Sequence, residues 1–379
     1  MTALSDLELA CGLVLGVHAP ARLPMAARDL TPVDALEAAI LPALRRAPCL
    51  VSFSGGRDSS SVLALATRVA RREGLPDPIP ATNVVPAAAA SDERRWQELV
   101  VAHLGLGDWI RLHWEDELDA IGPFARRALQ RHGLLWPFNA HFHVPLLEAA
   151  KGGALLTGIG GDELFAAATR SGRRALLVPR ALRRRRLARR ELVPFPWLTD
   201  PARRALAAVV ADGDAAVPWR LAPRLAWVRG YRYLAVGTGS LHRLAADAGA
   251  AIAHPLLDLA AWAAVARTAD RGFAGRTAAM RTVFGGLLPD EVLARTSKAS
   301  FDEVFFGSHS EAFARSWRGA GVPTEVVDAA ALREHWTTPA PLPQSLTLLQ
   351  AAWLAESARE GLDEPPGGDL EHAPLLRPA

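Results

Sequence analysis

The sequence predicts an α/β fold, with a mainly parallel β-sheet flanked by helices and a mostly helical C-terminal half. Short apolar runs alternate with helix-like segments from about residue 48 to residue 157, which is the pattern of a parallel sheet covered on both faces. A small-residue loop at residues 54–60 directly follows the first of these runs. Beyond about Gly172 the strand signal disappears, and alanine- and leucine-rich helical patterns continue to about Ala358.

The predicted elements begin with a helix at Thr31, where the order Thr-Pro-x-Asp combines a cap, a proline in the first turn and an acidic residue. The apolar run 49–53 predicts the first strand, and apolar residues at helical spacing within 62–69 predict a helix immediately after the loop. The later elements are expected in this order: a strand at 79–85, a helix at 91–104, a strand at 109–112, helices at 115–131 and 144–150, and a strand at 154–157.

Length and composition fit a soluble enzyme. The 379 residues divide into an N-terminal helical extension (1–47), an α/β core (48–172), a mostly helical part that completes the domain (173–360) and a disordered tail (361–379). Half of the residues are apolar, but no apolar stretch is long enough to cross a bilayer. Cys11 and Cys49 are the only cysteines, which excludes a disulfide framework. We therefore expect a cytoplasmic protein without membrane contacts.

The loop at residues 54–60 reads Ser-Gly-Gly-Arg-Asp-Ser-Ser and has the chemistry of a phosphate cradle. Its glycines let an anion approach the backbone amides, and the helix that follows directs unpaired N–H groups and a positive dipole at the same place. A carboxylate facing phosphate is useful when a metal ion lies between them, so Asp58 predicts a bound cation. The loop residues predicted to bind nucleotide phosphates are Ser54, Gly55, Gly56, Asp58, Ser59 and Ser60.

A second glycine-rich loop follows the strand at 154–157 and contains Gly-Gly-Asp-Glu at residues 160–163. Alone, this sequence would suit an acidic turn. In a parallel sheet, however, loops after different strands meet at the same edge, where ligands bind. Gly160 and Gly161 are therefore predicted to approach pyrophosphate. Asp58 and Asp162 are predicted to hold one Mg²⁺ between them.

The first loop resembles the pyrophosphatase loop (PP-loop) of enzymes that cleave ATP between the α- and β-phosphates, which implies an adenine nucleotide α-hydrolase-like fold. With the second loop, the chain is similar to the synthetase domain of asparagine synthetase, a family that also includes β-lactam synthetases and lasso-peptide cyclases. The resemblance covers about residues 48–306. Its further segments are Pro-Leu-Leu-Asp at 255–258, Gly-Arg-Thr at 275–277, Leu-Pro-Asp-Glu-Val at 288–292 and Arg-Thr-Ser-Lys-Ala-Ser-Phe at 295–301.

This resemblance implies ATP-dependent amide formation. A small-molecule or peptide carboxylate attacks the α-phosphate to give an acyl-adenylate and pyrophosphate, and an amine then displaces AMP. ATP and Mg²⁺ are the implied cofactors. Lys298 stands in the place of the family's catalytic lysine, and it is one of only two lysines among the 43 basic residues of the chain.

Two departures from the family pattern leave the second substrate open. Asparagine synthetases begin with a glutaminase domain whose nucleophilic cysteine follows the initiator Met, whereas this chain has Thr2 there. We therefore expect no glutamine hydrolysis within this chain. Ammonia would come free or from a separate glutaminase, or an amine of the substrate would replace it. Where the family often has Glu-x-Arg, this chain has Ala251, Ile252, Ala253 and His254, which predicts a changed substrate pocket.

The leading hypothesis is thus an AMP-forming amide ligase of the asparagine synthetase type. The alternatives are an intramolecular cyclase of lasso-peptide or β-lactam type, served by a precursor-peptide-binding protein, and a catalytically silent nucleotide-binding partner. The arginines at 183–186, 189 and 190 are predicted to be a solvated helix face rather than a docking site for an acidic peptide or tRNA. No aromatic residues interleave with them, so nucleic acid is not expected. His132, His141 and His143 are predicted to be structural rather than metal ligands.

Overall fold

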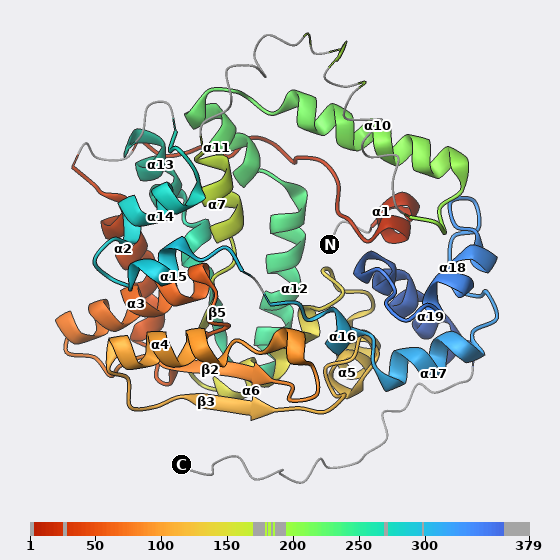
Figure 1. Cartoon of the computed structure of the whole chain (residues 1–379), viewed down its shortest axis with the longest axis horizontal. Helices are drawn as coiled ribbons and strands as arrows, with labels where there is room; N and C mark the ends of the chain where they lie inside the picture. The colour runs from red at the N-terminus through yellow and green to blue at the C-terminus, as the bar shows by residue number, and fades with distance from the viewer. Residues whose placement is uncertain are drawn as a thin grey trace.

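The computed structural model describes residues 4–25, 29–169, 179, 181, 182, 185, 195–268, 272–297 and 299–359. Within these residues, five short strands form one parallel sheet in the order β3-β2-β1-β4-β5 (Figure 1). In the register, Leu50 on the central strand pairs with Ile79 on one side and with Leu155 on the other. The strands are β1 (Cys49–Ser52), β2 (Ile79–Val84), β3 (Ile110–His113), β4 (Ala154–Leu156) and β5 (Ala251–Ala253).

Helices make up most of the remaining structure. In the first half they are α1 (Asp6–Cys11), α2 (Pro32–Leu44), α3 (Arg57–Arg72), α4 (Arg94–Leu104), α5 (Pro123–His132), α6 (Val144–Ala149) and α7 (Gly161–Ala167). In the second half they are α10 (Asp200–Ala216), α11 (Leu221–Arg229), α12 (Arg232–Ala248), α13 (Leu259–Thr268), α14 (Arg276–Phe284), α15 (Asp290–Ala294), α16 (Asp302–Phe305), α17 (Ser308–Ser316), α18 (Ala329–Trp336) and α19 (Leu346–Arg359).

The two faces of the sheet belong to separate apolar cores, because successive side chains of a strand point to opposite faces. Cys49 and Val51 of β1 lie in a core shared with α2, α3, α7 and α13. Leu50 points to the other face, into a core shared with α5, α6 and α12. Both faces are therefore buried, as expected for parallel strands with continuous apolar sequences.

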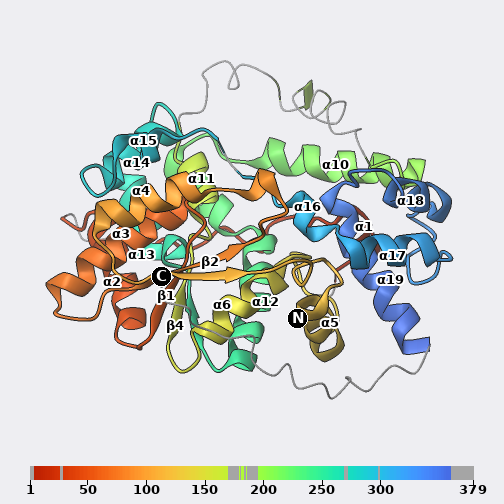
Figure 2. The same cartoon turned by 60° about the horizontal axis from the view of Figure 1, so that its bottom comes forward.

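A third core lies beside the sheet and joins both ends of the described chain. Helix α1 packs against α19, together with residues of α10, α17 and α18 (Figure 2). Trp197, Trp317 and Trp336 are fully buried in it. The C-terminal helices thus form a lobe that is attached to the sheet by α5 and α16.

Most of the predicted elements are confirmed within one to three residues. Helix α2 begins after Thr31, whose hydroxyl accepts a hydrogen bond from the Asp34 amide while the Asp34 carboxylate accepts one from the Thr31 amide. This reciprocal cap is the capping-box arrangement. Helix α2 also packs against α3 and α13 within the main core.

Two predictions about elements are wrong. The helix predicted at 115–131 begins only at Pro123, because residues 115–122 form turns around the fully buried Asp119. Its carboxylate accepts hydrogen bonds from the amides of Ile121, Gly307 and Ser310, which fixes a non-helical path. The sequence also missed β5, since a strand of only three residues is too short to show a period-2 pattern.

The predicted domain boundaries remain predictions, and the predicted disordered tail at 361–379 lies outside the described residues. Within the part of the chain that the structure describes, no helix combines the length and apolarity needed to cross a membrane.

Candidate active site

The first glycine-rich loop connects β1 to the N-terminus of α3, as predicted. Gly55 has φ +77°, a conformation that side-chain-bearing residues rarely adopt, and a Cβ there would lie 2.9 Å from Cγ of Gln97. The Ser54 and Ser59 hydroxyls lie 3.1 Å apart and close the loop across its base. Gly56 is the N-cap of α3 and provides no side-chain hydrogen bond to the helix, so the loop presents backbone rather than a capping group.

Ser60, predicted to bind phosphate, is fully buried. Its amide donates to the Gly56 carbonyl, and its hydroxyl has no hydrogen-bond partner among the described residues. Its side chain therefore presents no surface to a ligand in this conformation, unlike exposed Ser54.

The second loop lies directly against the first. A Cβ on Gly158 would lie 2.8 Å from the Ser59 amide nitrogen, and a Cβ on Gly161 would lie 2.3 Å from Cγ of Asp58. Gly160, with φ +97°, approaches Leu257, where a Cβ would lie 2.5 Å from Cδ2. Because real Cβ atoms do not approach this closely, Gly158 and Gly161 are required for the two loops to meet, and Gly160 allows the close approach of Leu257.

Replacing Gly161 by alanine should separate the two loops. The added methyl group would collide with Asp58, so we expect a loss of about 1–3 kcal/mol in the free energy of unfolding and weaker binding of ATP with Mg²⁺. Urea unfolding and calorimetric titration would measure the two effects. Gly239→Ala on α12 is the control: apart from the neighbouring backbone of α12, no atom of the described residues lies within 4 Å of its added Cβ. That change should be neutral or stabilise the helix by up to about 1 kcal/mol. Wild-type stability and ATP binding in Gly161→Ala would contradict the expectation that Gly161 makes room for Asp58 where the two loops meet.

The carboxylates of Asp58 and Asp162 converge on one cation, the guanidinium of Arg276 at the start of α14. Nη2 of Arg276 donates to both carboxylate oxygens of Asp58, at 2.8 and 2.7 Å, and Nη1 donates to Oδ1 of Asp162. Burial raises the pKa of Asp58, and Arg276 acts in the opposite direction. Arg57 reaches the same helix through Thr277, at 3.4 Å. The segment 275–277 therefore belongs to this site.

This arrangement fits a nucleotide-bound Mg²⁺. Such ions take one or two protein carboxylates and complete their shell with phosphate oxygens and water. Asp58 and Asp162 supply two carboxylates that already face one positive charge. Among the described residues, no group of three or more His, Cys, Asp or Glu side chains forms a self-sufficient metal site.

Arg295 holds the segment that precedes Lys298 against the first loop. Its Nη1 donates to the Gly55 carbonyl at 3.0 Å, and its guanidinium pairs with Glu93 and stacks over Trp96 at 4.7 Å. Its side chain is only 3% exposed. Lys298 itself lies outside the described residues. Both Arg276 and Arg295 stand in segments that resemble the family, but the sequence did not show which groups they contact.

The Pro-Leu-Leu-Asp segment supports the second loop and starts a helix. Leu257 packs against Gly160, and the Asp258 carboxylate accepts a hydrogen bond from the Ala261 amide at 2.9 Å in the first turn of α13. His254 is the residue before this segment, and its Nδ1 lies 2.7 Å from the hydroxyl oxygen of Thr157. Thr157 and His254 thus lie together where β4 and β5 end.

His254 is held in its neutral form. Burial lowers the pKa of His254 to about 3, and His242 and His143 act in the same direction. Its Nε2 is buried and has no hydrogen-bond partner among the described residues. This site therefore has a neutral imidazole with one nitrogen that makes no hydrogen bond to the described residues.

Glu163, beside Asp162, faces a different set of residues. Its carboxylate accepts a hydrogen bond of 3.0 Å from the Tyr233 hydroxyl. Tyr233 stacks on Tyr231 with ring centroids 5.4 Å apart. Burial raises the pKa of Tyr233, and Glu163 raises it further. The second loop thus directs Asp162 toward Arg276 and Glu163 toward an aromatic pair.

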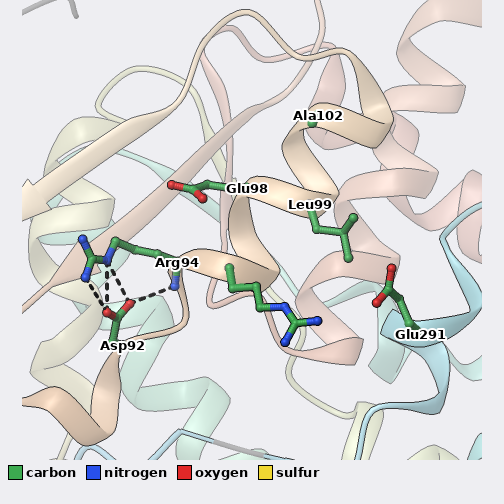
Figure 3. Close-up of a pocket in the computed structure, with 7 residues that line it drawn as sticks. Asp92, Arg94, Glu98, Leu99, Ala102 and Glu291 are labelled. Atoms are coloured by element: carbon green, nitrogen blue, oxygen red, sulfur yellow. Dashed lines mark hydrogen bonds and ion pairs between the residues drawn. The ribbon is translucent and has the colours of Figure 1, made fainter.

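A separate open cavity of about 800 Å³ lies on the outer side of α4 (Figure 3). Its lining includes Asp92 and Arg94, which pair with each other, and Glu291 of α15. None of the residues predicted to bind nucleotide or metal lines it.

The remaining histidines and arginines that the sequence singled out lie away from the two loops or outside the residues that the structure describes. His141 is buried between the carbonyls of Phe138 and Leu118, in agreement with a structural role. Of the arginine run at 183–190, only exposed Arg185 is described.

Comparison with known proteins agrees with this geometry. The family model of asparagine synthase matches residues 34–357, which is most of the chain. A search of curated proteins found no match. The matched region includes both glycine-rich loops, Arg276 and the segment around Lys298, and the family uses ATP and Mg²⁺ for ligase-type chemistry. This chain belongs to the asparagine synthase family.

Proposed function

We propose that this chain is an ATP-dependent amide-bond ligase that forms AMP and pyrophosphate. The observation that carries the proposal is the contact between the two glycine-rich loops after β1 and β4, with Asp58 and Asp162 converging on one cation. In the order β3-β2-β1-β4-β5, the strands that follow β1 are first added on one side of it (β2 and β3) and then on the other (β4 and β5). The point where the order changes side lies between β1 and β4. Ligands of such sheets bind at this point, beyond the carboxyl ends of the strands.

In this proposal the phosphates of ATP lie over the first loop. Ser54, Gly55, Gly56 and Ser59 provide backbone amides and hydroxyls, and Gly160 and Gly161 leave room for pyrophosphate. Asp58 and Asp162 would hold Mg²⁺, whose chemistry there is to neutralise phosphate charge. Lys298 would stabilise the charge that grows on the α-phosphate when the substrate carboxylate attacks.

The segment 251–254, where the sequence predicts a changed substrate pocket, favours a substrate other than aspartate. Ala251 and Ala253 carry no charge, and neutral His254 offers no fixed cation for a second carboxylate. This observation supports the alternative of an intramolecular cyclase, in which an amine of the same molecule attacks the acyl-adenylate. A peptide or small β-amino acid would then be the substrate, and no ammonia would be needed.

Pyrophosphate release from ATP, measured with a panel of candidate carboxylic acids in the presence and absence of ammonia, tests the proposal. Release that requires ammonia supports the ligase, and ammonia-independent release with an amino-bearing acid supports the cyclase. ATP binding without release for any acid would overturn both and indicate a catalytically silent nucleotide-binding partner.

A further inference from the structure

We propose that Arg276 is a built-in counter-ion of the metal site, which pairs with Asp58 and Asp162 and must release them when Mg²⁺ binds. This inference rests on the proposed nucleotide–magnesium site. It adds a competition between a residue of the chain and the metal for the same carboxylate oxygens.

Arg276 already contacts the carboxylate oxygens that a metal ion would use. Both oxygens of Asp58 already accept hydrogen bonds from Nη2 of Arg276, and Asp162 accepts one from Nη1. A cation bound between these carboxylates would lie within a few ångströms of the guanidinium, where like charges repel strongly. Metal and guanidinium therefore cannot both occupy this place, and Arg276 has to turn away.

The position of Arg276 in the fold also favours its release from the carboxylates. It is the first residue of α14, where the helix dipole disfavours a positive side chain. Its Nε is buried and lacks an acceptor among the described residues, so the guanidinium is incompletely hydrogen-bonded in this conformation. Both features lower the cost of moving Arg276 away from the two carboxylates with which it pairs.

A tethered cation makes free Mg²⁺ a poor competitor, because the arginine is always present at the site. Mg²⁺ that arrives with ATP brings additional contacts through the phosphates and the first loop. The consequence is a site that accepts the metal mainly together with the nucleotide.

Calorimetric titration with MgCl₂ alone tests this inference on the wild type and on Arg276→Gln. In Arg276→Gln, which lacks the guanidinium, we expect Mg²⁺ to bind about tenfold more tightly than in the wild type. The gain is limited because the site is open to solvent, which screens the repulsion between the two cations. Added Mg²⁺ should also raise the Tm of Arg276→Gln more than that of the wild type. Equal Mg²⁺ affinity in the two proteins would overturn the inference.

Two further variants keep the result interpretable. Arg281→Gln removes an arginine from the same helix that pairs with exposed Asp290 outside the site, and it should bind Mg²⁺ like the wild type. Arg276→Lys keeps the charge but lacks the planar fork that reaches both carboxylates, so its Mg²⁺ affinity should be intermediate. If Arg276→Gln does not fold, Arg276→Lys decides: unchanged affinity there overturns the inference.

Failure of this inference and failure of the proposed function are distinguishable. Formation of AMP by the wild type is measured separately and does not depend on the Mg²⁺ titration. AMP formation with unchanged Mg²⁺ affinity in the variants would reject only the role of Arg276.

Discussion

Lys298→Ala should lower kcat by about 10²–10³-fold while leaving the affinity for ATP close to that of the wild type. The reason is that a positioned cation gains strength as charge grows on the transferring phosphate, and it contributes much less to the bound ground state. Single-turnover formation of AMP and calorimetric binding of ATP would separate the two quantities. Arg295, three residues before Lys298 in the chain, donates a hydrogen bond to the Gly55 carbonyl of the first loop.

Lys151→Ala is the matched control, because Lys151 is the only other lysine and lies exposed in a turn before Gly152. It should have wild-type kcat. Unchanged turnover in Lys298→Ala would remove this residue from the mechanism. Loss of ATP binding in parallel with turnover would instead make it a ligand of the ground state.

Arg295→Met should destabilise the protein by about 3–5 kcal/mol, the usual cost of leaving one partner of a buried ion pair without its counter-charge. Glu93, whose side chain is 8% exposed, would lose its partner in the buried ion pair. The Gly55 carbonyl would lose its donor, and the first loop would lose its support from the segment before Lys298. Unfolding in urea and ATP affinity should therefore both change.

The control for Arg295 is Arg94→Met at the start of α4. Arg94 is exposed and pairs with exposed Asp92, so its loss should cost at most about 1 kcal/mol. In the double variant Glu93→Leu with Arg295→Met no buried charge remains, and part of the lost stability should return. Equal stability of Arg295→Met and Arg94→Met would show that the buried pair has no structural role.

The site was predictable from the sequence where function depends on local pattern. Strand, small-residue loop and helix follow one another at residues 49–72, and periodicity alone located them. The second loop was identified by its glycines, although the structure assigns Gly161 a reason that the sequence could not supply. It makes room for Asp58, which lies far away in the chain.

What remained hidden depends on contacts between distant segments. Asp119 interrupts a predicted helix because it binds amides near residue 307, and no local signal marks a carboxylate for this use. Arg276 and Arg295 stand in segments that resemble the family, but their contacts were hidden for a different reason. In a chain that uses arginine almost everywhere in place of lysine, residue type carries little information about which cations are buried.

The most direct test of the account is the identity of the nucleotide product. The wild-type protein is incubated with Mg²⁺, ATP labelled on the α-phosphate and the panel of carboxylic acids with and without ammonia; the labelled nucleotides are separated, and pyrophosphate is assayed in the same samples. The account predicts AMP with an equal amount of pyrophosphate, because the proposed attack is on the α-phosphate. ADP with inorganic phosphate would contradict it.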